Sequence, residues 1–532
     1  MSVQPYSVPD RAAARVEVFR LAYAIQTGDA DALEGVAALT ARARQEGWPE
    51  VERVGLFARA VHSWYHRDPE TAAALEALLD RAVADGDHVL SALALAMRGD
   101  RANIGASPAL VAAGEADLAR AVVMLEKPGG GALERITAHT ACGIGLYGRS
   151  LFELAEDQWA AALAAAESIA PGTVDFLVSP VLFNRAEMQV SWACMLYQLD
   201  DAQGLAERRR IGSAAIAAAA VLEMPDVWRD ELRALDLLLA AISGDDVGAT
   251  ARARLTPVTA SAAGRRWLGY LHLAAAVADG RANRSGASVA ARLATAALDP
   301  ASQPQAYDLA LFCAAERETR GGAGAGLRYG QRQLAEYWSN RLAHLEAVRA
   351  RIGAERLSSA YALVSRHAST DDLTGIGNRR SLDGYLDDLV RRGATGMALI
   401  VLDVDDFKRV NDRYGHPAGD EVLVCVARVL ARSIRATDLA VRIGGDEFAL
   451  VLADADVDTA YARAGALLRE LGRLRFEAID PGLRLGLSAG VAAGPPGAFD
   501  AVRAQADAAL YTAKGGGGGL VEGSRVARPI RD

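Results

Sequence analysis

Residues 442–448 read RIGGDEF and lie between two apolar segments of strand length. Two adjacent glycines between strands predict a tight β-hairpin, because glycine adopts positive φ angles without steric cost. Asp446 and Glu447 then stand at the tip of this hairpin. Neighbouring carboxylates repel one another and lose solvation unless a cation lies among them. By itself the segment fits either a surface turn or a metal site.

A second acidic cluster precedes the hairpin in the chain. The apolar run 397–402 ends in three acids within four positions, beginning at Asp403, and Lys408 follows. An uninterrupted apolar run of this length predicts a strand buried on both faces. If Asp403 faces the hairpin tip, the two clusters form an oxygen-rich site for Mg²⁺, which takes its other ligands from phosphate and water. This pattern indicates a nucleoside triphosphate and a two-metal reaction; the alternative is a solvated acidic loop.

Residues 371–532 resemble the GGDEF domain of bacterial diguanylate cyclases, which join two GTP into cyclic di-GMP and two pyrophosphates. The resemblance implies an α/β domain at 370–532, with a nucleotide-cyclase- or palm-like antiparallel sheet flanked by helices. The motifs that carry it, besides the hairpin, are 372–375, 378–380, 403–408, 411–412, 415–416, 419–420, 509–511 and 513–514.

The resemblance also implies a metal site. Its ligands are Asp403, the carbonyl of Val404, Asp446 and Glu447, holding two Mg²⁺ or Mn²⁺ ions per active site. Asp446 and Glu447 are the catalytic candidates, and Asp446 is the usual candidate for activating the attacking 3′-hydroxyl. A metal-bound hydroxyl loses its proton more readily, so the carboxylate need not be a strong base.

A substrate-binding set follows from the same resemblance: Phe407, Lys408, Asn411, Asp420 and Lys514. Asn411 and Asp420 are expected to read guanine, because a carboxylate accepts from the ring N–H and the exocyclic amine, a donor pair that adenine lacks. Lys408 and Lys514 are expected to neutralise the triphosphate as point charges. Taken without its context, either lysine is an ordinary surface residue.

Each such site binds one GTP, whereas the product joins two. The family places two domains face to face, so the resemblance implies a homodimer whose geometry controls activity. One position departs from the family pattern. Residues 515–519 are five glycines, and Gly518 stands where the family usually has an arginine near the phosphates. The sequence therefore predicts weaker phosphate binding, unless Arg525 or Arg528 compensates.

Arg435 and Asp438 precede the hairpin with the spacing of the family's inhibitory product site. Arginine pairs with phosphate and guanine, and aspartate accepts from the guanine edge, so product inhibition by cyclic di-GMP is expected. The structural alternative is a helix-end arginine followed by a turn-forming aspartate.

Residues 1–325 are rich in Ala, Leu, Glu and Arg, with regular breaks at Gly, Asp or Pro. The clearest predicted helical hairpin runs from Gly145 to Leu163, and residues 21–28 and 232–244 are also expected to be helices that end at glycine. The region resembles tetratricopeptide-type repeats, although without a clean period. We expect a sensory or interaction domain that binds a protein segment or a small molecule; a scaffold that only dimerises is the alternative.

A glycine-rich stretch at 321–326 marks a domain boundary, and a connector helix is expected over 326–369. Apolar residues recur in it at steps of three and four, which favours a parallel coiled coil. The same stripe also fits a single helix docked on the repeats. The stripe consists of Leu334, Trp338, Leu342, Leu345, Val348 and Ile352.

The net charge of −9 and the absence of a basic stripe argue against a nucleic-acid partner. The four cysteines are scattered without a CxxC pair, which fits a reducing, cytoplasmic location. We find no apolar segment long enough to span a membrane and no signal-peptide pattern. Two other functions compete with cyclase activity: a non-catalytic cyclic di-GMP receptor that uses Arg435 and Asp438, and a scaffold. The intact Asp403, Asp446 and Glu447 argue against a receptor, which needs none of them.

Overall fold

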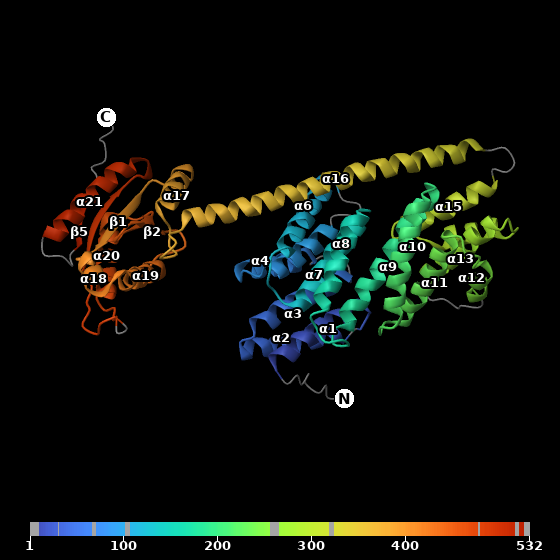
Figure 1. Cartoon of the computed structure of the whole chain (residues 1–532), viewed down its shortest axis with the longest axis horizontal. Coiled ribbons are helices and arrows are strands. Elements are labelled where there is room, and N and C mark those ends of the chain that lie inside the picture. Colours follow the sequence, from blue (N-terminus) through green and yellow to red (C-terminus); the bar gives the residue numbers. More distant parts are fainter. Residues whose placement is uncertain are drawn as a thin grey trace. The chain divides into compact units, whose positions relative to one another are not determined.

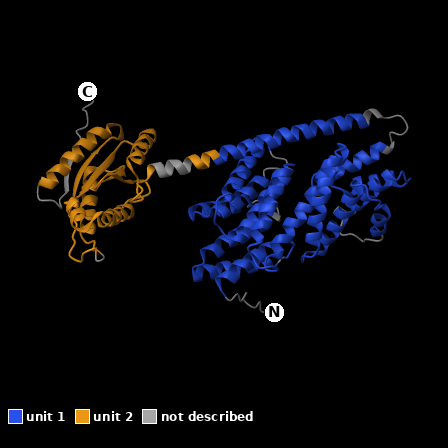
Figure 2. Ribbon diagram, viewed as in Figure 1, with its two compact units in different colours: residues 1–356 blue, residues 357–532 orange. Residues whose placement is uncertain are grey.

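The computed structural model describes residues 10–29, 31–65, 71–101, 107–255, 265–318, 324–476, 479–515 and 521–525. The chain divides into two compact units, residues 1–356 and residues 357–532 (Figure 2). Unit 1 is helical, as the sequence predicts, and unit 2 contains a five-stranded sheet.

The helices of unit 1 vary in length, which explains why the sequence shows no clean repeat period (Figure 1). Their bounds are α1 Arg11–Gln26, α2 Ala32–Glu46, α3 Pro49–Tyr65, α4 Thr71–Ala84, α5 His88–Arg101, α6 Pro108–Leu125, α7 Ala132–Tyr147, α8 Phe152–Ala166, α9 Asp175–Gln198, α10 Ala202–Ala220, α11 Asp226–Ile242, α12 Gly248–Arg254, α13 Arg265–Arg281, α14 Ala287–Ala297 and α15 Pro304–Glu318. The last helix, α16 Gly324–Ser369, begins in unit 1 and continues past the boundary at residue 356.

The helical hairpin predicted between Gly145 and Leu163 is confirmed as α7 and α8. Trp159 is fully buried between them, and its ring lies against Gly143. A Cβ atom at residue 143 would meet Nε1 of Trp159 at 2.2 Å, so this position accepts only glycine without a shift. A small residue therefore permits close packing of α7 and α8 at this position. A tetratricopeptide assignment does not follow from one hairpin.

Helix α9 joins the two hydrophobic cores of unit 1. Val181 and Met188 belong to the core built mainly from α1–α8, whereas Leu182 and Ala186 belong to the core built from α10–α15. Consecutive residues of α9 thus face different cores, so the helix is buried on several sides. Helix α9 contacts α1, α7 and α11.

Helix α16 corresponds to the expected connector, and its apolar stripe packs within unit 1. Leu345, Val348 and Ile352 are at most 3% exposed and join the core that contains α6–α8. Arg341 is also buried, donates to the carbonyl of Ser150 at 2.7 Å and forms an ion pair with Glu153. Over these residues the apolar stripe is therefore explained by a single helix docked on unit 1, and not by the parallel coiled coil that the sequence favoured.

In unit 2 the strand order is β2-β3-β1-β4-β5. The predicted antiparallel sheet is confirmed for β2, β3, β1 and β4, whereas β5 pairs with β4 in parallel. The elements are α17 Arg379–Arg391, β1 Met397–Val404, α18 Phe407–Tyr414, α19 His416–Arg432, β2 Leu439–Gly444, β3 Glu447–Ala453, α20 Val457–Leu471, β4 Leu487–Gly494, a 3₁₀ turn Pro496–Ala498, α21 Phe499–Gly515 and β5 Val521–Arg525.

Strand β1 is buried along its whole length, as its unbroken apolar run predicts. Ala398 and Ile400 face the core with α19 and α20, and Leu399 and Val401 face the core with α17 and α21 (Figure 1). Side chains alternate between the two faces of a strand, so Asp403 is expected on the α17–α21 face. No helix among the described residues is both long and apolar enough to cross a lipid bilayer.

Candidate active site

The end of β1 and the tip of the β2–β3 hairpin form the centre of the site. Asp403 lies directly opposite Glu447 in the β1–β3 register, so both side chains leave the sheet on the same face. The backbone N–H of Val404 donates to the carbonyl of Asp446 at 3.3 Å. The hairpin turns at Gly445, whose φ of 53° favours glycine. The expected approach of the two acidic clusters is thus present.

Lys514, near the end of α21, reaches the same place. Its Nζ lies 2.7 Å from Oδ1 of Asp403, and Asp403 is only 6% exposed. Burial raises the pKa of Asp403, the hydrogen bond from Lys514 opposes this, and the charges of Asp446 and Glu447 raise the pKa further. A negative field therefore surrounds Asp403, and the lysine partly neutralises it.

The donor atoms at this site suit a hard divalent cation. Asp403 and Glu447 supply carboxylate oxygens, and the carbonyl of Val404 follows Asp403 directly. No three acidic, His or Cys side chains among the described residues are arranged as a complete metal cage. Such a cage is not required for Mg²⁺, which uses one or two carboxylates together with phosphates and water. The residues at this site therefore fit a bound Mg²⁺ ion.

Asp405 was not assigned a role from the sequence, and the structure gives it a structural one. Its Oδ1 accepts from the buried Ser488 at 2.8 Å, and its backbone N–H donates to the carbonyl of Gly486 at 2.9 Å. Ser488 lies opposite Asp403 on β4. This link holds the end of β1 beside β4 and thereby fixes the position of Asp403. No motif pointed to Ser488.

Helices α18 and α19 carry the expected nucleotide-binding residues. Lys408 and Asp420 are exposed at the starts of these helices, and Phe407 is half-buried against the core. The side chain of Asn411 lies against Gly419: a Cβ atom there would meet its Oδ1 at 2.0 Å. Because Asp420 follows Gly419 in the chain, the structure brings the two proposed guanine readers to the same helix pair.

Arg442 fixes the conformation of the hairpin, a role that the sequence analysis missed. Its Nε and Nη2 donate to the carbonyl of Gly445 at 2.9 and 2.8 Å, and its Nη1 donates to Asp371 at 3.1 Å. Burial would raise the pKa of Asp371, but hydrogen bonds from Thr374 and Arg442 outweigh it and hold the pKa below the usual value. The only sequence signal for this role was the position of Arg442, a polar residue two positions before the Gly-Gly turn.

Arg435 and Asp438 lie in the turn between α19 and β2. Oδ2 of Asp438 accepts from the backbone N–H of Arg435 at 3.0 Å, and its Oδ1 accepts from Ala453 at 3.3 Å. Asp438 therefore already stabilises the turn, as expected if it is a turn-forming aspartate. The side chain of Arg435 is exposed. Gly518 and Arg528 lie outside the described residues, and only the backbone of Arg525, in β5, is described.

The family model described as "Diguanylate cyclase, GGDEF domain" matches residues 368–519. The chain is 36% identical over 165 residues to the response regulator PleD of Caulobacter vibrioides. This match covers 29% of this chain and 36% of PleD. It is 34% identical over 226 residues to the diguanylate cyclase DgcP of Pseudomonas aeruginosa, covering 41% of this chain and 34% of DgcP. The chain thus spans about a third of the length of these relatives.

A solved structure of the coiled coil and GGDEF domain of DgcB from Caulobacter crescentus, in complex with c-di-GMP, is 32% identical. The match covers 35% of this chain and 99% of that chain, with a TM-score of 0.31. The family match and the motif order coincide on the unit that contains Asp403 and the hairpin. The C-terminal unit of this chain therefore carries a GGDEF domain of the diguanylate cyclase type.

Proposed function

We propose that the chain condenses two GTP into cyclic di-GMP and two pyrophosphates. The observation that carries this proposal is the placement of Asp403 opposite Glu447, with Asp446 at the adjacent hairpin tip and Lys514 on Asp403. Three carboxylates and a lysine at one end of the sheet suit a nucleoside triphosphate bound with a divalent cation.

Asp403, Asp446, Glu447 and the carbonyl of Val404 would hold two Mg²⁺ or Mn²⁺ ions. When bound, the metal would polarise the phosphates and ease deprotonation of the 3′-hydroxyl. Asp446 would accept that proton, since its backbone carbonyl accepts from Val404 and this contact holds it beside the end of β1. Arg442 positions the tip through the carbonyl of Gly445.

Substrate recognition would fall to residues on α18, α19 and α21. Asn411 and Asp420 would read the guanine edge, with Phe407 beside them. Lys408 and Lys514 would offset the triphosphate charge, Lys514 by exchanging Asp403 for a phosphate oxygen. Each domain would contribute one bound GTP, so activity would require a homodimer of facing sites.

Control is proposed at two places. The helical unit 1, for which a tetratricopeptide-like repeat remains our interpretation, would change how often two catalytic domains meet when its own ligand binds. Cyclic di-GMP would inhibit the enzyme by binding at Arg435. Asp438 would contribute mainly by holding the turn that presents this arginine.

The proposal predicts that purified full-length protein with GTP and Mg²⁺ releases cyclic di-GMP, measured by chromatography. Asp446→Asn should lower turnover by about 10²–10⁴-fold, because the general base is lost. Asp454→Asn is the matched control: Asp454 follows the other end of β3 at a φ of 51°, which asparagine also adopts. Full activity in a folded Asp446→Asn variant would show that Asp446 is not the general base. If the unmodified protein forms no product, the alternative function of a non-catalytic cyclic di-GMP receptor is favoured.

A further inference from the structure

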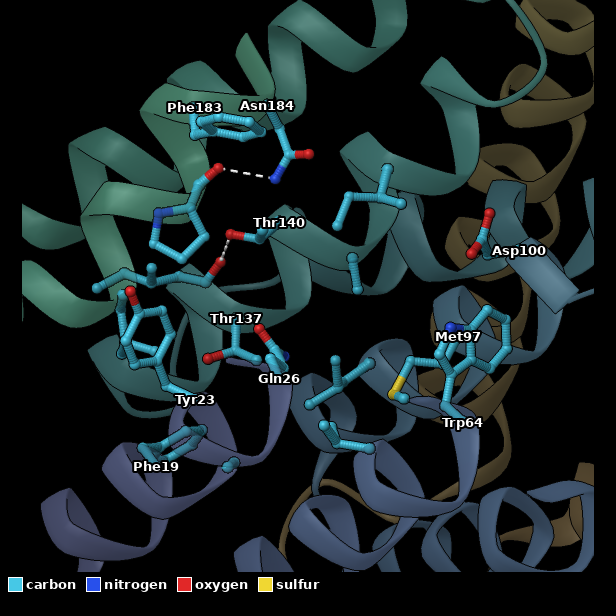
Figure 3. Close-up of a pocket in the computed structure, with 18 of the residues that line it drawn as sticks. Phe19, Tyr23, Gln26, Trp64, Met97, Asp100, Thr137, Thr140, Phe183 and Asn184 are labelled. Atoms are coloured by element: carbon cyan, nitrogen blue, oxygen red, sulfur yellow. Dashed lines mark hydrogen bonds between the residues drawn. The ribbon is translucent and has the colours of Figure 1, made fainter. Parts of the chain in front are cut away.

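Unit 1 contains a cavity of about 410 Å³ that the proposed cyclase reaction does not use. Its lining residues come from α1, α3, α5, α7, α9 and α11 (Figure 3). Small-molecule sites are concave and measure about 300–1,000 Å³. The cavity therefore has the size of a ligand site, and its walls are helices of the unit rather than loops.

Aromatic side chains are concentrated in the wall of this cavity. Phe183 and Trp228 stack with their ring centroids 5.1 Å apart, and Tyr23 meets Trp228 edge-on at 6.1 Å. Rings stabilise one another in such stacked and edge-on pairs. The wall therefore favours a flat ring as its occupant. The aromatic residues among the described lining residues are Phe19, Tyr23, Phe57, Trp64, Phe183 and Trp228.

Helix α7 presents two threonines to the cavity. Thr137 and Thr140 are three residues apart, so they share one face of the helix. The hydroxyl of Thr137 donates to the carbonyl of Leu133 at 2.9 Å, and that of Thr140 donates to the carbonyl of Ile136 at 2.6 Å. A hydroxyl has one hydrogen and two lone pairs. Each threonine uses its hydrogen within the helix, so toward a ligand its oxygen acts as an acceptor.

Asn184 supplies a third acceptor, from α9. Its Nδ2 donates to the carbonyl of Pro180 at 2.7 Å, and in Figure 3 its oxygen lies on the side of the amide away from this bond. A carbonyl only accepts, so this contact determines which end of the amide is the nitrogen. Phe183 precedes Asn184 and also lines the cavity. An acceptor thus adjoins the stacked ring pair.

Other polar residues of the lining are compatible with these acceptors. Asp100, Glu187 and Glu231 line the cavity too, and carboxylate oxygens accept hydrogen bonds whatever further partners they have. The amide of Gln26 can donate as well as accept, so it suits a ligand group of either kind. A ligand that brings a hydrogen-bond donor therefore finds partners on several helices.

The rings and the acceptors together define the class of ligand. A neutral donor needs no opposite charge in a buried site, whereas a charged group does. We propose that this cavity binds a small uncharged aromatic molecule, whose ring packs on Phe183 and Trp228 while an N–H or O–H group donates to Thr140 and Asn184. The inference names a ligand class for the sensory role proposed for unit 1, and it does not depend on the cyclase reaction.

The first test uses the unmodified full-length protein without GTP, so its failure is separate from a failure of the cyclase assay. Indole and benzofuran have the same fused-ring shape, but an oxygen replaces the indole N–H in benzofuran. In calorimetric titrations indole should bind at least about tenfold more tightly, because benzofuran leaves the acceptors unpaired. Equal affinities, or no saturation by indole at about 5 mM, would overturn the proposal.

A second pair of ligands tests the charge. Tryptophol and tryptamine share the indole ring and a two-carbon chain, which ends in a hydroxyl group in tryptophol and in an ammonium group in tryptamine. Tryptophol should bind at least as tightly as tryptamine, because the ammonium group loses its hydration on burial. Tighter binding of tryptamine by about tenfold or more would contradict the uncharged class.

The third test locates the hydrogen bonds. Thr140→Val combined with Asn184→Leu removes two acceptors with little change in volume. Indole binding should weaken by about tenfold or more, and benzofuran binding should stay unchanged. Thr295→Val is the matched control: Thr295 is half-buried on α14, donates to the carbonyl of Ala291 at 3.0 Å in the same way, and does not line the cavity.

Circular dichroism shows whether each variant retains its helices. If the double variant does not, the single Thr140→Val variant is titrated, and a loss of indole affinity in the same direction is expected. Unchanged indole affinity in a folded variant would place the binding elsewhere and refute the site.

Discussion

Both units gather carboxylates from separate segments of the chain, but they bring them together in different ways. In unit 2, Asp403 and Glu447 meet because two neighbouring antiparallel strands fix their register. In unit 1, Asp100, Glu187 and Glu231 come from α5, α9 and α11, far apart in the chain. Strand pairing follows from local patterns, whereas the meeting of helices depends on side-chain packing over the whole unit.

The second difference concerns the cation. Lys514 already contacts Asp403 at 2.7 Å, whereas none of the described residues that line the cavity of unit 1 is Lys, Arg or His. A site that exchanges an internal cation for a substrate and metal can release its product and turn over.

The largest expected effect tests whether α16 belongs to unit 1 or to a dimer seam. Leu345 is 3% exposed and Leu342 is 40% exposed. Leu345→Asp should destabilise unit 1 by about 3–5 kcal/mol, since it removes a buried leucine and buries a charge. Leu342→Asp should change stability by less than about 1 kcal/mol. Urea unfolding monitored by circular dichroism measures both.

A coiled coil would give the opposite pattern. Both substitutions would then lower dimer content on dilution, measured by light scattering, because both residues belong to the predicted stripe. Concentration-independent destabilisation by Leu345→Asp alone would confirm that the stripe is used within one chain. Equal dissociation by both variants would contradict the docked arrangement.

These helices also show where sequence reasoning stops. Apolar residues at steps of three and four indicate one buried helix face but do not identify what covers it. The same holds for the cavity, whose lining residues are ordinary helix positions when read along the chain. In unit 2 the reverse is true: residues 397–402 and the hairpin around 442–448 predicted β1, β2 and β3, because an unbroken apolar run, paired glycines and strand-end acids are local signals.

Even there the supporting contacts were not predictable. Arg442 binds Asp371, 71 positions away in the chain, and Ser488 binds Asp405, 83 positions away. Neither pair has a spacing rule, because hydrogen bonds between distant segments depend on the final tertiary structure. The sequence therefore indicated the acids of the site and omitted the residues that hold them in place.

A smaller effect is expected at the proposed product site. Arg435→Ala should raise the inhibition constant for cyclic di-GMP about tenfold, because a charge-assisted hydrogen bond to phosphate contributes about 1.5–3 kcal/mol. Arg432→Ala is the matched control: Arg432 is exposed one turn earlier and faces Glu470 at 3.6 Å. Initial-rate assays with added product measure the constants. If cyclic di-GMP inhibits both variants equally, Arg435 does not contribute to product binding.

The smallest effect concerns the acid of unit 1 that Arg149 partly neutralises. Burial raises the pKa of Asp100 to about 6, from 3.8, and Arg149 opposes the shift. A carboxyl whose pKa is higher in the folded state favours folding at low pH, and this contribution is lost as the pH rises through about 6. Asp100→Asn removes the charge, so its stabilising effect should grow by about 1 kcal/mol between about pH 5 and pH 8.

Thermal or urea unfolding at the two pH values measures this difference. Glu207→Gln serves as the control, because Glu207 is exposed on α10 and pairs with Arg210 at the surface. If instead the variant is uniformly less stable, the interaction with Arg149 outweighs the burial of Asp100.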